Sequence, residues 1–142
     1  MLVFKIEGVP VPKGRPRFAR RGNFVQTYTD KKTMSYEELV AFTAKQAMGS
    51  GKLINGPVEM FLYIRLPVPK SYTKKATKDC LEGLVRPTKK SDIDNYVKSL
   101  MDGMNGVVYE DDSQVVDLHV RKVYSEIPGV DVCVLEAHEI RT

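Results

Sequence analysis

The sequence has few of the residues on which zinc sites and disulfide frameworks depend. Its 142 residues include only two cysteines, Cys80 and Cys133, and neither belongs to a C-x-x-C pair. A zinc site is therefore not expected, and we interpret both cysteines as small apolar side chains in a reducing compartment. The two histidines, His119 and His138, lie in strand-like stretches, where an ordinary strand position is the expected role of each.

Long apolar runs are missing as well. The apolar stretches are short and interrupted by charges, so the sequence predicts no transmembrane span. Residues 1–5 lack the basic segment and the long apolar core of a signal peptide and indicate a first strand instead, so a cytoplasmic protein is expected. A hydrophobic fraction of 42% supports a real core. The length suits one compact domain, residues 1–142, and is too short for two.

Acidic residues are scarce in the first part of the chain, and basic residues are scarce in the last. Residues 1–91 carry 18 Lys/Arg against 7 Asp/Glu, a balance of +11, whereas residues 92–142 carry 4 against 11, a balance of −7. Such a division suits a protein that binds a polyanion and holds cations against it, although charge asymmetry is also common in small domains. The candidate nucleic-acid contacts are Lys13, Arg15, Arg17, Arg20, Arg21, Lys89 and Lys90.

The alternation and spacing of apolar residues predict a single α+β domain with the element order β-α-β-α-α-β-β. We expect one mixed sheet covered by helices. The prolines and glycines of residues 10–30 predict irregular structure after the first strand. The expected strands are 2–9, 58–66, 115–124 and 131–139, with a turn at Pro128-Gly129, and the expected helices are 34–48, 71–83 and 92–104.

Two groups of carboxylates mark the acidic part. Asp92 and Asp94 start the helix at 92–104, where Ser91 is a natural N-cap and Asp94 the acidic partner of a capping box. Positions two apart on a helix point about 200° apart, so these carboxylates converge only if Asp92 is extended and Asp94 begins the helix. Lys98 follows one turn later on the face of Asp94, where it can reach a phosphate or an attacking water. The second group is Glu110, Asp111 and Asp112.

These acids predict a site for a hard cation such as Mg²⁺, which takes one or two carboxylates together with waters and substrate phosphates. Other interpretations stay open. Asp92 and Asp94 also favour a helix N-terminus through the helix dipole. Asp94 and Lys98 can form a surface pair worth about 0.2–0.5 kcal/mol, and residues 110–112 suit a solvated turn. A D-x-D pattern by itself is weak, because nucleotidyltransferases and glycosyltransferases share it.

The combined pattern is more specific. From Asp92-Ile93-Asp94-Asn95-Tyr96-Val97-Lys98 to Asp111-Asp112-Ser113-Gln114-Val115-Val116, the sequence resembles the RusA family of Holliday junction resolvases, small endonucleases often carried by phages and prophages. The shared features are a D-x-D-N helix start, a lysine one turn later, a small-residue stretch at residues 105–107 and a D-D-x-Q-V strand entry. The resemblance is sharpest over residues 86–124 and extends more loosely to the whole chain.

The resemblance implies a role for each residue. Asp92, Asp94 and Asp112 match the family's metal-binding acids, and Lys98 matches its candidate catalytic lysine. Asp111 matches the second acid of its pair and is a further candidate ligand, and Glu110 and Asp117 are the remaining acidic candidates. The implied cofactor is Mg²⁺, with Mn²⁺ as a substitute, and no nucleotide cofactor or membrane is expected. The implied protein is a homodimer in a bacterial cell, of phage or prophage type, that resolves four-way DNA junctions by paired nicks in recombination and repair.

Two alternatives from other classes stay open. A D-x-D nucleotidyltransferase would use Mg²⁺ on a nucleoside triphosphate, but it usually needs a glycine-rich phosphate cradle, for which Gly49-Ser50-Gly51 is a poor candidate. A non-enzymatic DNA-binding module would keep the acids for structural reasons. Such a module would show no Mg²⁺-dependent strand scission.

Overall fold

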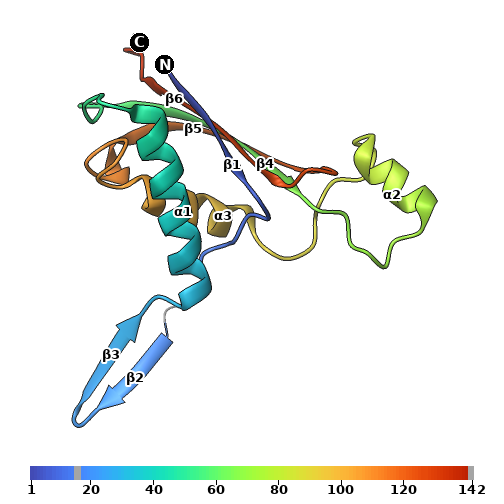
Figure 1. The fold of residues 1–142 in the computed structure, drawn as a ribbon, viewed down its shortest axis with the longest axis horizontal. Helices are drawn as coiled ribbons and strands as arrows, with labels where there is room; N and C mark the ends of the chain where they lie inside the picture. Colours follow the sequence, from blue (N-terminus) through green and yellow to red (C-terminus); the bar gives the residue numbers. More distant parts are fainter. Residues whose placement is uncertain (15–16, 141–142) are drawn as a thin grey trace.

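The centre of the fold is a four-stranded sheet in the order β1-β6-β4-β5 (Figure 1). The computed structural model of the chain describes residues 1–14 and 17–140, and only the backbone of Arg17. β4 (Val58–Leu66) runs parallel to β5 (Val115–Tyr124) and antiparallel to β6 (Gly129–Glu136). β6 also pairs antiparallel with β1 (Leu2–Glu7). The predicted mixed sheet is therefore confirmed.

Two helices, α1 (Lys31–Met48) and α3 (Ile93–Met104), cover one face of this sheet (Figure 1). In β4, Met60, Leu62 and Ile64 are buried, while Phe61 and Tyr63 between them are exposed, because successive side chains of a strand point to opposite faces. The helices contribute Tyr36, Val40, Ala44, Tyr96, Leu100 and Met104 to the core. The result is the predicted α+β domain, in which helices cover one side of the sheet.

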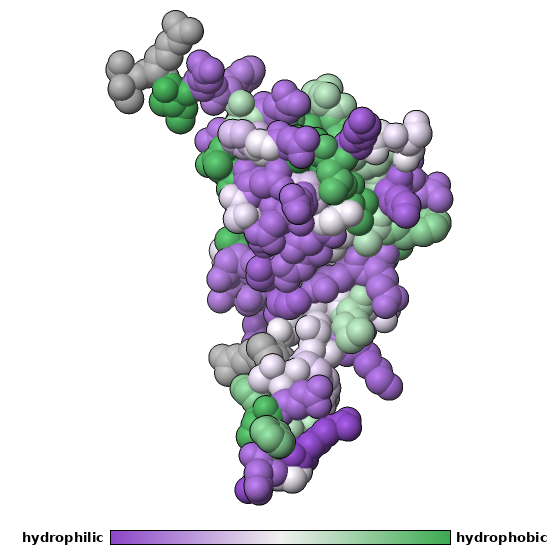
Figure 2. Space-filling view, turned by 90° about the vertical axis from the view of Figure 1, so that its left-hand side faces the viewer, coloured by the Kyte–Doolittle hydropathy of each residue, from purple (hydrophilic) through white to green (hydrophobic). Residues whose placement is uncertain are grey.

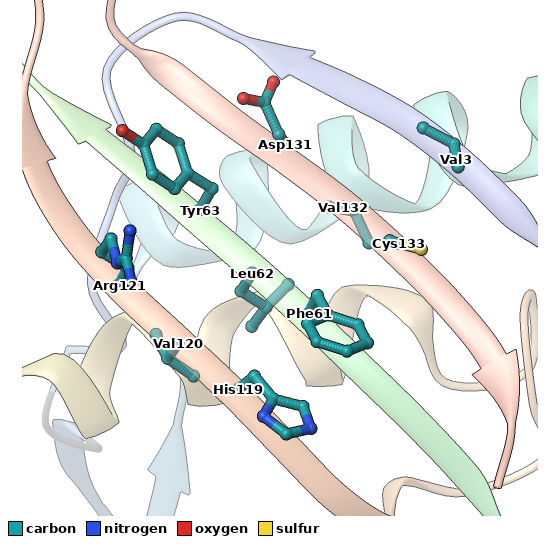
Figure 3. Close-up of a pocket in the computed structure, with 10 residues that line it drawn as sticks. All are labelled: Val3, Phe61, Leu62, Tyr63, His119, Val120, Arg121, Asp131, Val132 and Cys133. Carbon is teal, nitrogen blue, oxygen red and sulfur yellow. The ribbon is translucent and has the colours of Figure 1, made fainter.

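The other face of the sheet is open (Figure 3). There the ring of Phe61 stacks on His119, with centroids 4.3 Å apart, and His119 Nε2 lies 3.0 Å from Glu59 Oε2. His119 thus has the strand position expected for it, whereas His138 lies beyond the end of β6. Both cysteines are free thiols: Cys80 is buried, and Cys133 is half-buried.

Two elements lie outside this two-layer body (Figure 1). One is α2 (Lys74–Leu81), and the other is a hairpin of β2 (Arg17–Arg21) and β3 (Phe24–Tyr28). The irregular structure predicted for residues 10–30 is wrong for the hairpin. Its strands begin after the prolines, and Gly22, with φ +60°, occupies the first position of a two-residue turn that favours such a backbone.

The helix boundaries follow the capping residues. α1 begins at Lys31, earlier than predicted, because Asp30 Oδ1 accepts a hydrogen bond from Thr33 N at 2.9 Å. α2 is shorter than the predicted 71–83, since its N-cap is Thr73. Among the described residues, no helix combines the length and the apolar character needed to cross a membrane.

Candidate active site

The start of α3 carries the first pair of acids. Asp92 is the N-cap residue, with an extended backbone (ψ 149°), and Asp94 lies in the first helical turn. Under this backbone arrangement the two carboxylates can converge. The predicted capping is wrong, because the helix begins one residue later and Asp92 replaces Ser91 as the N-cap. The Asp92 side chain makes no capping hydrogen bond, so the helix does not engage its carboxylate.

Asp94 and Asp112 line the same surface hollow of ≈ 270 Å³. Lys98 lines it too, so the structure brings three of the four predicted catalytic residues together, with Asp92 next to them at the helix start. The hollow is open to solvent, so a substrate phosphate and waters can reach its charged groups. The apolar residues of the hollow are Ile93, Val97, Met101, Leu118 and Val120.

Lys98 is held between two carboxylates. Its Nζ lies 3.0 Å from Asp102 Oδ1 and 3.1 Å from Asp112 Oδ2. The hydrogen bond to Asp102 and, to a smaller extent, the one to Asp112 raise the pKa of Lys98 above its ordinary value. The side chain is therefore positively charged near neutral pH. Lys98 thus pairs with Asp102 and Asp112, whereas the sequence had suggested a surface pair between Lys98 and Asp94. The side chain is still 55% exposed, so a phosphate can reach it.

Asp102 is a site residue that the sequence analysis missed. Besides its bond to Lys98, its Oδ2 lies 3.1 Å from Lys13 Nζ, and its side chain is largely buried. Its only signal in the sequence was the i, i+4 spacing from Lys98. Lys13 Nζ also pairs with Glu37, so its charge is already balanced within the folded chain. The DNA contact expected of Lys13 stays a prediction.

Gln114 links the acidic loop to the rest of the fold, a role that its place in the D-D-x-Q-V pattern did not predict. Its Oε1 accepts hydrogen bonds from the backbone N–H groups of Glu110 (2.9 Å) and Asp111 (3.2 Å). Its Nε2 donates to the carbonyl oxygens of Ile54 (2.9 Å) and Gly56 (3.0 Å). One side chain therefore fixes the position of the loop through four backbone groups.

Asp111 and Asp112 have different surroundings although they are adjacent. Asp111 is the N-cap of a single 3-10 turn (Asp112–Gln114), and its Oδ2 accepts from Ser113 N at 3.0 Å. Hydrogen bonds from the side chain and the backbone of Ser113 hold the pKa of Asp111 below its ordinary value. Asp112 instead faces Lys98. The two adjacent acids therefore differ in role: Asp111 caps the turn of the loop, and Asp112 lines the hollow.

The segment that leads into the hairpin lies along the site helix. Ser99 Oγ donates a hydrogen bond to the carbonyl oxygen of Val11 at 2.6 Å. Lys13 N donates to the carbonyl oxygen of Asn95 at 2.8 Å, within the D-x-D-N segment itself. Residues 11–13 are therefore fixed on α3 beside the acids.

A model of the endodeoxyribonuclease RusA family matches residues 7–135, a range that includes every site residue just described. The chain belongs to the RusA endodeoxyribonuclease family. A relative from Bacillus subtilis (strain 168), named "Uncharacterized protein YqaN", is 43% identical over 135 residues, which is 94% of each chain. The name of this relative states no activity. The match therefore shows a relative of similar length, and only the family match bears on function. The resemblance seen in the sequence is confirmed.

RusA-family nucleases in general depend on a divalent metal, and the donors of this site fit a hard cation. They are carboxylates, and Asp92 offers one that no capping bond engages. Within residues 1–14 and 17–140, no three His, Cys, Asp or Glu side chains stand close enough together to enclose an ion. The structure therefore fits an open site of one or two carboxylates that waters and a phosphate complete, as Mg²⁺ prefers.

The remaining predicted residues that the structure describes do not line the hollow. Asp117 alternates with Leu118, which lines the hollow, so Asp117 faces the opposite side of the sheet. Lys89 and Lys90 are exposed just before α3, with Lys89 Nζ 5.7 Å from the centre of the Tyr72 ring. Arg20 and Arg21 are exposed on the hairpin. Arg15 and the side chain of Arg17 lie outside the described part of the chain.

Proposed function

We propose that this RusA-family protein is a Mg²⁺-dependent, structure-selective endodeoxyribonuclease that resolves four-way DNA junctions in recombination and repair. The observation that carries the proposal is the meeting of Asp94, Lys98 and Asp112 in one hollow beside Asp92, in a chain of this family. Mn²⁺ is expected to substitute for Mg²⁺, and no nucleotide cofactor is expected.

The chemistry is hydrolysis of a phosphodiester. When bound, Mg²⁺ neutralises the scissile phosphate, activates a water and stabilises the leaving oxygen. Asp92, Asp94 and Asp112 are the proposed ligands, and the ion would take one or two of these carboxylates together with waters and a phosphate oxygen. Lys98, fixed by its two carboxylate partners, places a second positive charge where it can contact a phosphate oxygen. The water oxygen joins phosphorus as the bond to the 3′-oxygen breaks, which leaves a 5′-phosphate and a 3′-hydroxyl that a ligase can rejoin.

The number of nicks supports a homodimer. One chain offers one acidic constellation and makes one nick at a time. Resolving a four-way junction takes two nicks, in strands of like polarity related by the two-fold axis of the junction. A C₂ dimer relates two copies of the site by the same symmetry. Sedimentation or light scattering should therefore report a dimer, and a monomer that degrades linear and branched DNA alike would contradict the proposal.

A synthetic four-way junction tests the activity directly. Strands should be cut with Mg²⁺ and not in its absence, and linear duplex of the same sequence should be cut far less. A DNA-binding module without enzymatic activity would bind the junction and cut it under neither condition. Cutting that proceeds equally well after chelation of divalent ions would rule out the proposed use of the acids.

The nucleotidyltransferase alternative gains no support from the fold. Gly49 is the C-cap of α1, and its N–H donates to the carbonyl oxygen of Lys45 at 3.0 Å. Residues 49–51 thus end a helix, whereas a phosphate cradle leads into a helix N-terminus. A cytoplasmic location, a phage or prophage origin, and one domain over the full range 1–142 stay predictions, the last supported by the family match to residues 7–135.

A further inference from the structure

The β2–β3 hairpin exposes aromatic side chains that the proposed chemistry does not use. Phe18 is 70% exposed, Phe24 78% and Tyr28 48%. The two strands pair with each other in a sheet of their own, and they extend beyond the body of the molecule (Figure 1). A two-stranded hairpin without a further layer is marginally stable in water. Rings left in solvent on such an element indicate that a binding partner covers them.

The strand register places one phenylalanine on each face of the hairpin. Residues opposite each other in an antiparallel pair share a face, and neighbours along a strand alternate between faces. Phe18 shares its face with Arg20, whereas Phe24 lies opposite Arg21 on the other face. Each face therefore combines a flat ring with a guanidinium group. An element that lies flat on a surface needs rings on one face, but rings on both faces suit insertion between two surfaces.

The charge of the segment indicates the chemistry of the partner. Residues 8–29 contain five basic residues and no acid. In Figure 2 the lower end of the molecule, where the hairpin lies, shows strongly hydrophilic and hydrophobic residues side by side. Nucleic acid offers both matching features, because its phosphates attract the arginines and its bases stack on aromatic rings.

The hairpin is fixed at its base, next to the acids. Residues 11–13 lie on α3, as described above, and Gly14 N donates to Thr33 Oγ1 of α1 at 3.1 Å. A Cβ at Gly14 would lie 1.9 Å from Asp30 Oδ2, so a larger residue here would displace the side chain that caps α1. Strands of five residues at about 3.4 Å each span roughly 17 Å. The chain thus enters the hairpin from a segment that lies on the helix of the acids, and the rings lie farther out along the strands.

We propose that Phe18 and Phe24 stack on bases at the branch point of a DNA junction, one on each side of the inserted hairpin. This inference rests on the proposed function and names how the substrate is distinguished. In linear duplex each base is already stacked on its neighbours, and access to a base face costs unstacking energy. At a branch point the stack is interrupted, so base faces are available at lower cost. The rings would therefore distinguish branched from linear DNA without reading sequence.

Binding in metal-free buffer tests this without cleavage. The probes are a four-way junction with 2-aminopurine at the branch point and a linear duplex of the same sequence. In the variant Phe18→Ala/Phe24→Ala, junction affinity should fall at least about tenfold, while duplex affinity should change less than about twofold. The fluorescence change of 2-aminopurine on binding should be lost. The salt dependence of duplex binding should stay as in wild type, since Arg20 and Arg21 remain.

Two further variants separate stacking from folding of the hairpin. Val25→Ala removes an apolar side chain that is 66% exposed on the same hairpin, and it should bind both DNAs like wild type. Phe18→Leu/Phe24→Leu keeps apolar bulk but removes the flat rings, and it should lose junction preference as the alanine variant does. Full preference in the leucine variant would overturn the inference.

Other outcomes also bear on the inference. An alanine double variant that keeps wild-type junction preference and the wild-type fluorescence change would overturn it. So would equal losses on junction and duplex, because the rings would then serve the hairpin or DNA binding in general. Cleavage by wild type with Mg²⁺ separates the two proposals. If wild type cuts junctions and the double variant binds like wild type, the function stands and the stacking role fails; if wild type makes no cut, the function fails.

Discussion

The hollow at the start of α3 and the β2–β3 hairpin are connected through residues 11–13, which lie on α3, but they are held in different ways. In the hollow, Lys98 forms ion pairs with two carboxylates. Gln114 forms hydrogen bonds with four backbone groups and so holds the loop that carries Asp112. The hairpin is fixed at its base, while Phe18 and Phe24 are exposed to solvent beyond it. The comparison indicates that the groups proposed for chemistry are positioned before substrate arrives, whereas those proposed for binding take their final position on the substrate.

The largest expected effect comes from the acids of the hollow. Asp92→Asn, Asp94→Asn and Asp112→Asn should each abolish cleavage and leave junction binding largely intact, because an amide lacks the charge that holds Mg²⁺. In metal-free buffer these variants should bind DNA somewhat more tightly, since carboxylate–phosphate repulsion is reduced. Glu126→Gln, an exposed acid in the turn before β6, is the matched control. Near wild-type cutting by any one aspartate variant removes that residue from the site.

A smaller effect, on binding rather than chemistry, is expected from the arginines of the hairpin segment. Neutralising all four to glutamine should weaken junction binding and flatten its salt dependence, by about 0.9 in log–log slope for each phosphate that the protein no longer neutralises. Cleavage at saturating protein should be retained. A quadruple variant with an unchanged salt slope would mean that the segment is basic only for solubility. The four are Arg15, Arg17, Arg20 and Arg21.

Gln114→Ala should have a moderate effect that links the two parts of the comparison. It leaves four backbone groups without their partner, and water compensates some of them, so the free energy of unfolding should fall by about 1 kcal/mol. Cleavage should fall about tenfold, since Asp112 is no longer held in place, while binding governed by the hairpin should not change. Chemical denaturation and single-turnover cleavage measure the two effects. Gln46→Ala, on the exposed side of α1, is the control, and equal behaviour of the two variants would contradict the positioning role.

The smallest expected effect concerns Lys98 and alkaline pH. Its folded-state pKa lies above the ordinary value of 10.5, so the stability that its ion pairs contribute is fully present below pH 10.5 and is lost as pH rises through the folded-state pKa. The difference in unfolding free energy between wild type and Lys98→Met should therefore be constant near neutral pH and shrink above pH 10.5. Because the side chain is half exposed, the difference should stay below about 1 kcal/mol. A difference that grows with alkaline pH would be inconsistent with these pairs.

Much of the fold follows from apolar patterns in the sequence. The strand at 58–66 alternates so regularly that its predicted and observed bounds agree, and the helix at 92–104 differs by one residue. The hairpin was missed because five-residue strands after several prolines leave little alternation to detect. Its signal was the turn at Gly22-Asn23, with Arg21 and Phe24 paired across it.

The site was predictable only in part. Asp92, Asp94, Lys98 and Asp112 are named by a pattern along the chain, and the fold brings the last three to one hollow. Gln114 belongs to the quoted pattern and Asp102 follows Lys98 by one turn, but the roles of both depend on contacts with residues 13, 54 and 56, which are distant in sequence. The N-cap also depended on backbone detail, because Ser91 and Asp92 are both good capping residues.

The central claim is that the two acidic sites of a symmetric dimer make paired, symmetric nicks in a four-way DNA junction. The most direct measurement uses a four-way junction with each strand labelled in turn, incubated with Mg²⁺ and resolved on denaturing gels. The account predicts nicks at paired, symmetric positions in two opposing strands of like polarity, giving nicked duplexes that a ligase seals. Cuts scattered over all four strands, or equal cutting of linear duplex, would show a general nuclease with a similar metal site and contradict the claim.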